Sequence, residues 1–167
     1  SAFLLYGISQ IYGLLGTTRY DEINNAMISM SDISPGVMVG MLMLVAGLGF
    51  KVAAVPFHMW APDTYEGAPI PVAAYIAVGS KSAAFALILR LFSEAFIPVI
   101  ASWQIIMIVL SVLTIVIGNL GALVQQNIKR LLAYSGIAHS GYLLMGISVL
   151  ATHQFDQSIS TEFLALV

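Results

Sequence analysis

The sequence predicts an all-α protein, a polytopic bundle of transmembrane helices. Hydrophobic residues make up 59% of the 167-residue chain, only 8% of its residues are charged, and the mean hydropathy is +0.94. An ordinary soluble domain carries about 25% charged residues. The apolar segments also have the length of about 20 residues that a helix needs to cross a bilayer core. A soluble enzyme is therefore excluded, and the expected partners are lipid and other membrane subunits.

Polar stretches divide the chain into a series of expected membrane spans. The spans are expected at about 1–16, 36–60, 70–92, 99–124 and 128–152, with the start of another at about 159–167. Pro35 stands just before the second span, where its missing N–H costs nothing. The stretch 17–35 is expected to be a polar loop and 61–69 a tight turn. Since the chain starts and stops within apolar sequence, we expect residues 1–167 to be an internal fragment of one membrane domain.

Composition excludes several other kinds of function. The chain has no cysteine, which rules out disulfides and thiolate metal sites. Its net charge of −2 provides no basic patch for nucleic acid. The sequence also shows neither a nucleophile-base-acid arrangement nor a metal-ligand cluster. We therefore expect no cofactor and no metal in this chain.

Lys51 and Lys81 are the most informative residues, because each lies inside a long apolar segment. A charged side chain at mid-bilayer costs about 2.5 to 3.5 kcal/mol on insertion scales. At a rise of 1.5 Å per residue, both lysines lie roughly 14 to 16 Å from the turn at 61–69, and His139 lies roughly 16 Å from the turn at 125–130. These turns are on the same side, so three titratable groups share one layer. Hydroxyl residues flank them: Ser80, Ser82, Tyr134, Ser135, Ser140 and Tyr142.

Each of these residues also has a structural interpretation. An isolated lysine can snorkel toward the interface, although two at mid-depth on adjacent helices favour a functional role. His139 is explained at least as well by packing as by proton transfer. Lys129 and Arg130 lie at a turn, where anchoring of the topology is the default interpretation over a functional role. The turn acids Asp63 and Glu66 are expected to act as caps and loop contacts.

Pro56 predicts a discontinuous helix near Lys51–Pro56. A proline inside a helix frees backbone carbonyl groups that protein or water must satisfy, and broken helices at mid-membrane mark ion sites in transporters. All eight Asp and Glu residues fall in loops or at span ends, so neither buried lysine has a carboxylate at its depth. Burial without a counterion disfavours the charged form of an amine. Either lysine is therefore a candidate proton carrier, with its opposing carboxylate elsewhere in the chain or on another subunit.

Two blocks of sequence carry a resemblance to a known family. The first runs GFKVAAVPFHMWAPDTYEGAP over 49–69 and is followed by the pair Ser80-Lys81; the second runs GNLGAL over 118–123 and NIKRLLAYSGIAH over 127–139. Both resemble the antiporter-like membrane subunits of respiratory complex I, and the first block is most similar to the subunit N branch of that family. The resemblance covers nearly the whole chain.

The resemblance implies an inverted-repeat antiporter-like fold and a function. It implies a proton-translocating membrane subunit of an NAD(P)H-quinone oxidoreductase, with Lys51 on the discontinuous helix and Lys81 on the next helix along a central lysine axis. His139 and Lys129 are secondary candidates. Redox chemistry would occur elsewhere, with NADH, FMN, iron-sulfur clusters and quinone in partner subunits. The implied location is an energy-transducing membrane: the bacterial cytoplasmic membrane, with the thylakoid and the mitochondrial inner membrane as alternatives.

Two other functions remain open at this point. The same fold is expected in a subunit of a multi-subunit cation/proton antiporter, which would purify without redox partners. A structural membrane subunit is the other alternative, and its lysines would only neutralise acids on a neighbouring subunit.

Overall fold

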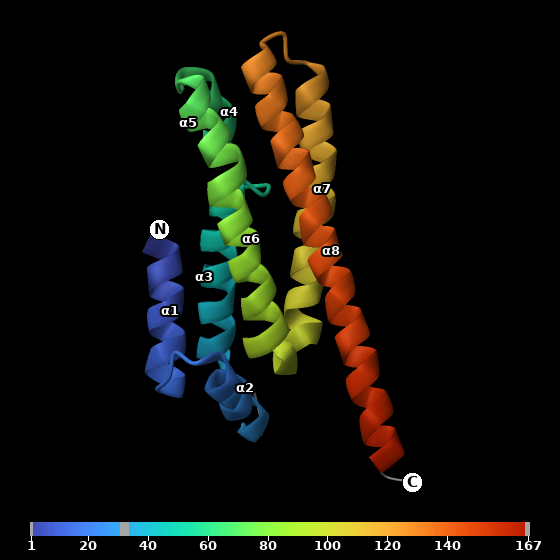
Figure 1. Cartoon of the computed structure of the whole chain (residues 1–167). Coiled ribbons are helices and arrows are strands. Elements are labelled where there is room, and N and C mark those ends of the chain that lie inside the picture. Colours follow the sequence, from blue (N-terminus) through green and yellow to red (C-terminus); the bar gives the residue numbers. More distant parts are fainter. Residues whose placement is uncertain (1, 31–33, 166–167) are drawn as a thin grey trace.

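The structure is a computed structural model that describes residues 2–30 and 34–165, with side chains described as far as residue 150. Its helices lie roughly along one direction (Figure 1). In chain order they are α1 (Ala2–Leu15), α2 (Tyr20–Ser29), α3 (Pro35–Val52), α4 (Trp60–Gly67), α5 (Ile70–Tyr75), the π-helical η1 (Ile76–Ser80), α6 (Lys81–Arg90), the π-helical η2 (Leu91–Ala95), the short 3-10 helix η3 (Ile97–Val99), α7 (Ile100–Leu123) and α8 (Ile128–Ala165). The predicted all-α fold is confirmed.

Three helical segments of the described chain are long and apolar enough to cross a membrane. They are Pro35–Val52, Ile70–Ala95 and Ile97–Leu123. The second of these is one continuous helical segment made of α5, η1, α6 and η2. The shorter α1 is also apolar and packs along α3 (Figure 1). One end of the bundle holds α4 and the turn between α7 and α8, and the opposite end holds α2 (Figure 1).

The helix α3 begins and ends where its sequence dictates. Pro35 is its first residue, and the Ser34 side chain caps it by accepting a hydrogen bond from the N–H of Gly36 at 3.3 Å. The helix ends at Val52, because Ala53 adopts a left-handed conformation with φ of +58°. The expected discontinuous helix near Lys51–Pro56 is confirmed. The segment expected as one span over 36–60 is thus α3 followed by a non-helical stretch at 53–59.

Two stretches expected to be a loop and a turn contain helices instead. Within 17–35, α2 forms because Ile23 and Met27, four residues apart, bury one face of the helix in the core. Within 61–69, α4 forms because Ala61 and Tyr65, with the same spacing, pack in a cluster with residues of α8. Tertiary burial therefore overrides the turn-forming composition of both stretches.

The helix α8 runs without interruption from Ile128 to Ala165, past the span end expected near residue 152. Residues 151–165 contain neither glycine nor proline, so nothing in the backbone chemistry of this stretch stops the helix. Residues 166–167, part of the span start expected at 159–167, lie outside the described residues.

Glycines allow α7 and α8 to pack closely along their length (Figure 1). A Cβ atom on Gly118 of α7 would lie 2.8 Å from the backbone nitrogen of Ala138, and one on Gly141 of α8 would lie 2.9 Å from that of Ile115. Backbone atoms inside a helix cannot move aside independently. The close approach of the two helices therefore depends on the missing side chains at these positions.

We predict that Gly118→Ala lowers the thermal unfolding midpoint of the full-length protein in detergent. Overpacking costs about 1 to 3 kcal/mol, which exceeds the roughly 1 kcal/mol that alanine gains over glycine inside a helix. Gly146→Ala in α8 is the matched control, since a Cβ there meets open space within this chain. Equal midpoints for the two variants would contradict the packing argument.

Candidate functional site

The break after α3 leaves backbone polar groups that other helices satisfy. In a continuous helix the carbonyl of Val52 would accept from the N–H of residue 56, but Pro56 has none. Ser140 of α8 donates its hydroxyl to this carbonyl instead, with an Oγ to O distance of 2.9 Å. On the other side of the break, the N–H of Val55 donates to Thr114 Oγ1 of α7 at 3.0 Å. The broken helix is therefore held by hydroxyls from α7 and α8.

Lys81 lies beside this break and is buried, with 8% of its surface exposed. It is the first residue of α6, and its Nζ donates to the carbonyl of Gly136 at 2.9 Å and to Ser140 Oγ at 3.3 Å. Both acceptors are neutral and both belong to α8. Ser140 thus joins this lysine to the break.

Lys51 and His139 do not share these contacts. Lys51 lies in the last turn of α3 with its side chain exposed, and it has no hydrogen-bond or ion-pair partner among the side chains described. His139 is also exposed, and its ring has an edge contact with the ring of Tyr142, with 6.1 Å between centroids. The structure therefore joins Lys81 to Ser140 by hydrogen bonds, and it does not join the three titratable groups to one another.

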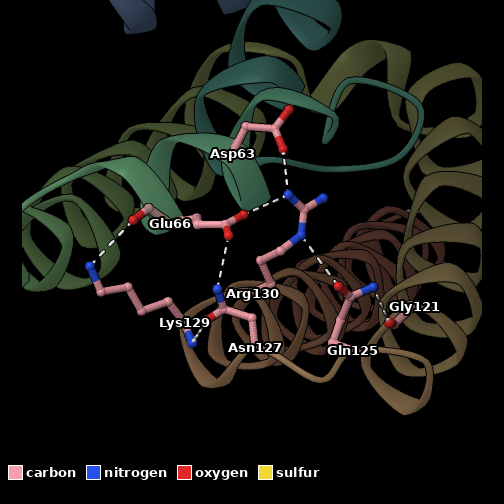
Figure 2. Close-up of polar contacts among 7 residues, drawn as sticks. All are labelled: Asp63, Glu66, Gly121, Gln125, Asn127, Lys129 and Arg130. Atoms are coloured by element: carbon pink, nitrogen blue, oxygen red, sulfur yellow. Dashed lines mark hydrogen bonds and ion pairs between the residues drawn. The ribbon is translucent and has the colours of Figure 1, made fainter.

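A cluster of charged and amide side chains connects α4 to the turn between α7 and α8 (Figure 2). The Nη1 atom of Arg130 lies 2.8 Å from both Asp63 Oδ1 and Glu66 Oε2. Glu66 Oε1 accepts from Asn127 Nδ2 at 2.8 Å, and Asn127 also caps α8 by accepting from the N–H of Lys129 at 3.0 Å. The turn acids thus make the expected structural contacts, but neither caps α4, whose N-cap residue Met59 has no side-chain capping hydrogen bond.

Lys129 and Arg130 have distinct places in this cluster. Lys129 Nζ donates to the carbonyls of Glu66 at 3.3 Å and Ala68 at 3.2 Å, where a cation is favoured by the C-terminal end of α4. The hydrogen bond to Glu66 and the neighbouring Asp63 raise the pKa of Arg130 above its ordinary value, so Arg130 stays charged at any physiological pH. These contacts support the anchoring interpretation of both residues, and a role of Lys129 in proton transfer stays a prediction.

Two further residues lie at the break and were not predicted from the sequence. Thr114 is fully buried in α7, and only the fold shows that it serves the break. His58 lies within the stretch 53–59 and is buried, and its Nδ1 has no hydrogen-bond partner among the described atoms. Proximity to Pro56 was a usable signal for His58, whereas no local pattern marks Thr114.

Comparison with known proteins places this helical arrangement in a family. The profile described as NADH:quinone oxidoreductase/Mrp antiporter, TM, matches residues 1–165. The chain belongs to this antiporter family. Subunit N of the NADH-quinone oxidoreductase from Desulforamulus reducens is 52% identical over 147 residues, which are 88% of this chain and 31% of that protein. The resemblance to the subunit N branch is therefore confirmed.

Chains of two solved membrane complexes have a similar fold. A chain of respiratory complex I from Thermus thermophilus is 39% identical with a TM-score of 0.71, over 87% of this chain and 30% of that chain. A chain of the Mrp complex from Dietzia sp. is 26% identical with a TM-score of 0.79, over 88% of this chain and 27% of that chain. The chain thus spans less than a third of the length of these relatives.

We predict that Thr114→Val destabilises the full-length antiporter-family protein by about 1 to 3 kcal/mol, the cost of a buried N–H left without an acceptor. Valine has nearly the same shape as threonine, so the packing around the site is preserved. Thermal unfolding in detergent measures the loss. Thr114→Ser keeps the hydroxyl and is expected to lose less stability than Thr114→Val, and the reverse order would exclude the hydrogen bond to Val55 as the cause.

We also predict that Arg130→Ala loosens α4, because Asp63 and Glu66 lose their shared cation. Amide hydrogen exchange of residues 60–67 in the full-length protein is expected to become severalfold faster, because α4 opens more often without these contacts. The control is Arg19→Ala, which removes exposed ion pairs to Asp21 and Glu22 far from α4. Equal exchange of α4 in the two variants would mean that the Arg130 cluster does not hold this helix.

Proposed function

We propose that this chain is part of a proton-translocating membrane subunit of an NADH-quinone oxidoreductase. The single observation that carries the proposal is the buried amine of Lys81 beside a broken helix, held in the described part of the chain by neutral acceptors. An intramembrane ionisable residue of this kind is by default a functional group. The identity of 52% to a subunit N and the match of the antiporter family to residues 1–165 support the same conclusion.

The contacts of Lys81 suit a group that gains and loses a proton. A carbonyl and a hydroxyl stabilise the ammonium through hydrogen bonds, but neither forms the ion pair that would lock the charge in place. Lys51 is proposed as a second carrier on the same path, because it is exposed at the C-terminal end of α3, where the helix dipole favours a cation. His139 is retained as a weaker candidate because it lies one residue from Ser140.

The rest of the catalytic cycle is assigned to partner subunits. We propose that NADH, FMN, iron-sulfur clusters and quinone are bound there, and that other membrane subunits and lipid cover the exposed apolar faces of this chain. Electron transfer in those partners would alter the charge along the lysine axis, so the coupling to this subunit is electrostatic. The bacterial relatives favour the cytoplasmic membrane of a bacterium as the location.

A second candidate function is transport in a multi-subunit cation/proton antiporter. The TM-score of 0.79 to a chain of the Mrp complex supports it, whereas the lower identity of 26% favours the oxidoreductase subunit. Copurification of redox subunits with the full-length protein separates the two candidates.

We predict that Lys81→Ala in the assembled complex lowers proton pumping and coupled quinone reduction by about threefold or more. A positioned proton-transfer group commonly contributes far more than that factor. Proton uptake is followed with a pH-sensitive dye in inverted vesicles, and quinone reduction is followed as NADH oxidation. Normal pumping in this variant would rule the proposal out.

In the same assay, Lys81→Arg distinguishes a proton-transfer role of Lys81 from a structural role of its positive charge. Arginine keeps the positive charge but does not release its proton, so pumping is expected to stay low. A structural subunit predicts the opposite result, since arginine still neutralises an acid on a neighbour. Assembly is monitored by the subunit content of the purified complex.

A further inference from the structure

Ser140 is the one residue of the site that touches both Lys81 and the broken helix in the described chain. Its Oγ lies 3.3 Å from Lys81 Nζ, 2.9 Å from the carbonyl oxygen of Val52 and 3.0 Å from that of Gly136. Only 1% of Ser140 is exposed, so within this chain solvent does not compete for these contacts. Three helices therefore meet at a single hydroxyl group.

A hydroxyl has one proton, and here two carbonyl oxygens lie within its reach. A lysine ammonium has three protons and no lone pair, so a charged Lys81 can only donate to Ser140 Oγ and to Gly136. The carbonyl of Gly136 then accepts from Lys81 in addition to its bond within α8, and its two lone pairs are occupied. The proton of Ser140 is therefore directed to the remaining acceptor, the carbonyl of Val52.

We propose that Ser140 is a positioning residue that makes the hydrogen bonding of the broken helix depend on whether Lys81 carries a proton. The inference rests on the proposed function, in which Lys81 passes its proton to water of the proton path. The neutral amine keeps two protons and gains a lone pair, so it becomes an acceptor for the Ser140 hydroxyl. No covalent bond to Ser140 forms or breaks, because only its hydroxyl rotates.

Rotation of this hydroxyl has a specific consequence for α3. The Val52 carbonyl cannot accept a hydrogen bond within its own helix, because Pro56 has no N–H. When the Ser140 hydroxyl donates to the neutral amine of Lys81 instead, the Val52 carbonyl therefore loses the hydrogen-bond donor that the described chain gives it. Val52 is the last residue of α3 and follows Lys51 directly. A change in the charge of Lys81 therefore changes the hydrogen bonding at the end of α3. This helix carries Lys51, the second proposed proton carrier.

The other titratable side chains near this contact make no hydrogen bond to either partner. On the elements that contact Lys81, the described titratable side chains are Lys51 of α3, Glu94 of η2, Arg90 of α6 itself, and Lys129, Arg130, Tyr134, His139 and Tyr142 of α8. Arg90 and Glu94 form an ion pair with each other, 3.1 Å apart. Within the described chain, Ser140 is therefore the only side chain that links Lys81 to the end of α3 by hydrogen bonds.

The test uses the intact complex in membrane vesicles, with rates expressed per assembled complex. Ser140→Ala is expected to lower coupled quinone reduction by about twofold or more and to change its pH profile, because the Lys81 ammonium loses an acceptor. Ser140→Thr keeps the hydroxyl and is expected to retain the wild-type profile.

The matched control is Ser111→Ala. Ser111 is an equally buried serine that donates to the carbonyl of Gly141 at 2.8 Å and does not touch Lys81, so its removal is expected to leave the pH profile unchanged. The double variant of Ser140→Ala with Lys81→Ala is expected to pump no less than Lys81→Ala alone, because Ser140 acts through Lys81. Additive losses would overturn the proposal.

The outcomes separate this inference from the proposed function. If Lys81→Ala abolishes pumping while Ser140→Ala has the wild-type rate and profile, only the role of Ser140 fails. If Lys81→Ala itself pumps normally, the proposed function fails first. Should Ser140→Ala not assemble, Ser140→Cys provides a similar volume with a weak donor and acceptor, and an unchanged pH profile in that variant overturns the role of Ser140.

Discussion

The missing N–H of Pro56 is the constraint on which the centre of this structure depends. A membrane-spanning helix must satisfy its own backbone groups, and α3 cannot satisfy the carbonyl of Val52. The solution is external, with Ser140 donating to that carbonyl and Thr114 accepting from the N–H of Val55. The break therefore exists only in the context of α7 and α8, and those helices bring polar groups to the depth at which Lys81 lies.

The helix α8 binds both α3, which precedes the break, and α4, which follows it. Ser140 contacts the end of α3, while Arg130 and Lys129 bind α4 through the acids Asp63 and Glu66 and through the carbonyls at the end of α4. The two sets of contacts differ in kind. Ion pairs lie at the end of the bundle, where side chains are partly exposed, whereas hydrogen bonds to neutral groups hold the buried break. The ion pairs thus lie where the desolvation of their charged groups costs least.

This arrangement explains why a buried lysine is compatible with a stable helix bundle. Lys81 receives two hydrogen-bond acceptors from α8 without a permanent counterion. Close contact between α7 and α8, permitted by Gly118 and Gly141, fixes the height of α8 against the rest of the bundle. The position of the acceptors is consequently set by helix packing, which is more rigid than a loop and keeps the surroundings of the amine defined.

Hydropathy, a missing N–H group and charge are local properties of the chain, so the helical membrane fold, the break near Pro56 and the unusual placement of Lys51 and Lys81 could be predicted from the sequence. It did not determine α2 and α4, which form because tertiary burial of one face outweighs a turn-like composition. Nor did it show which hydroxyl serves the break, since Ser140 follows Val52 by 88 residues. Only packing of α8 against α3 and α6 decided that Lys81 meets Ser140 while Lys51 and His139 face outward from this chain.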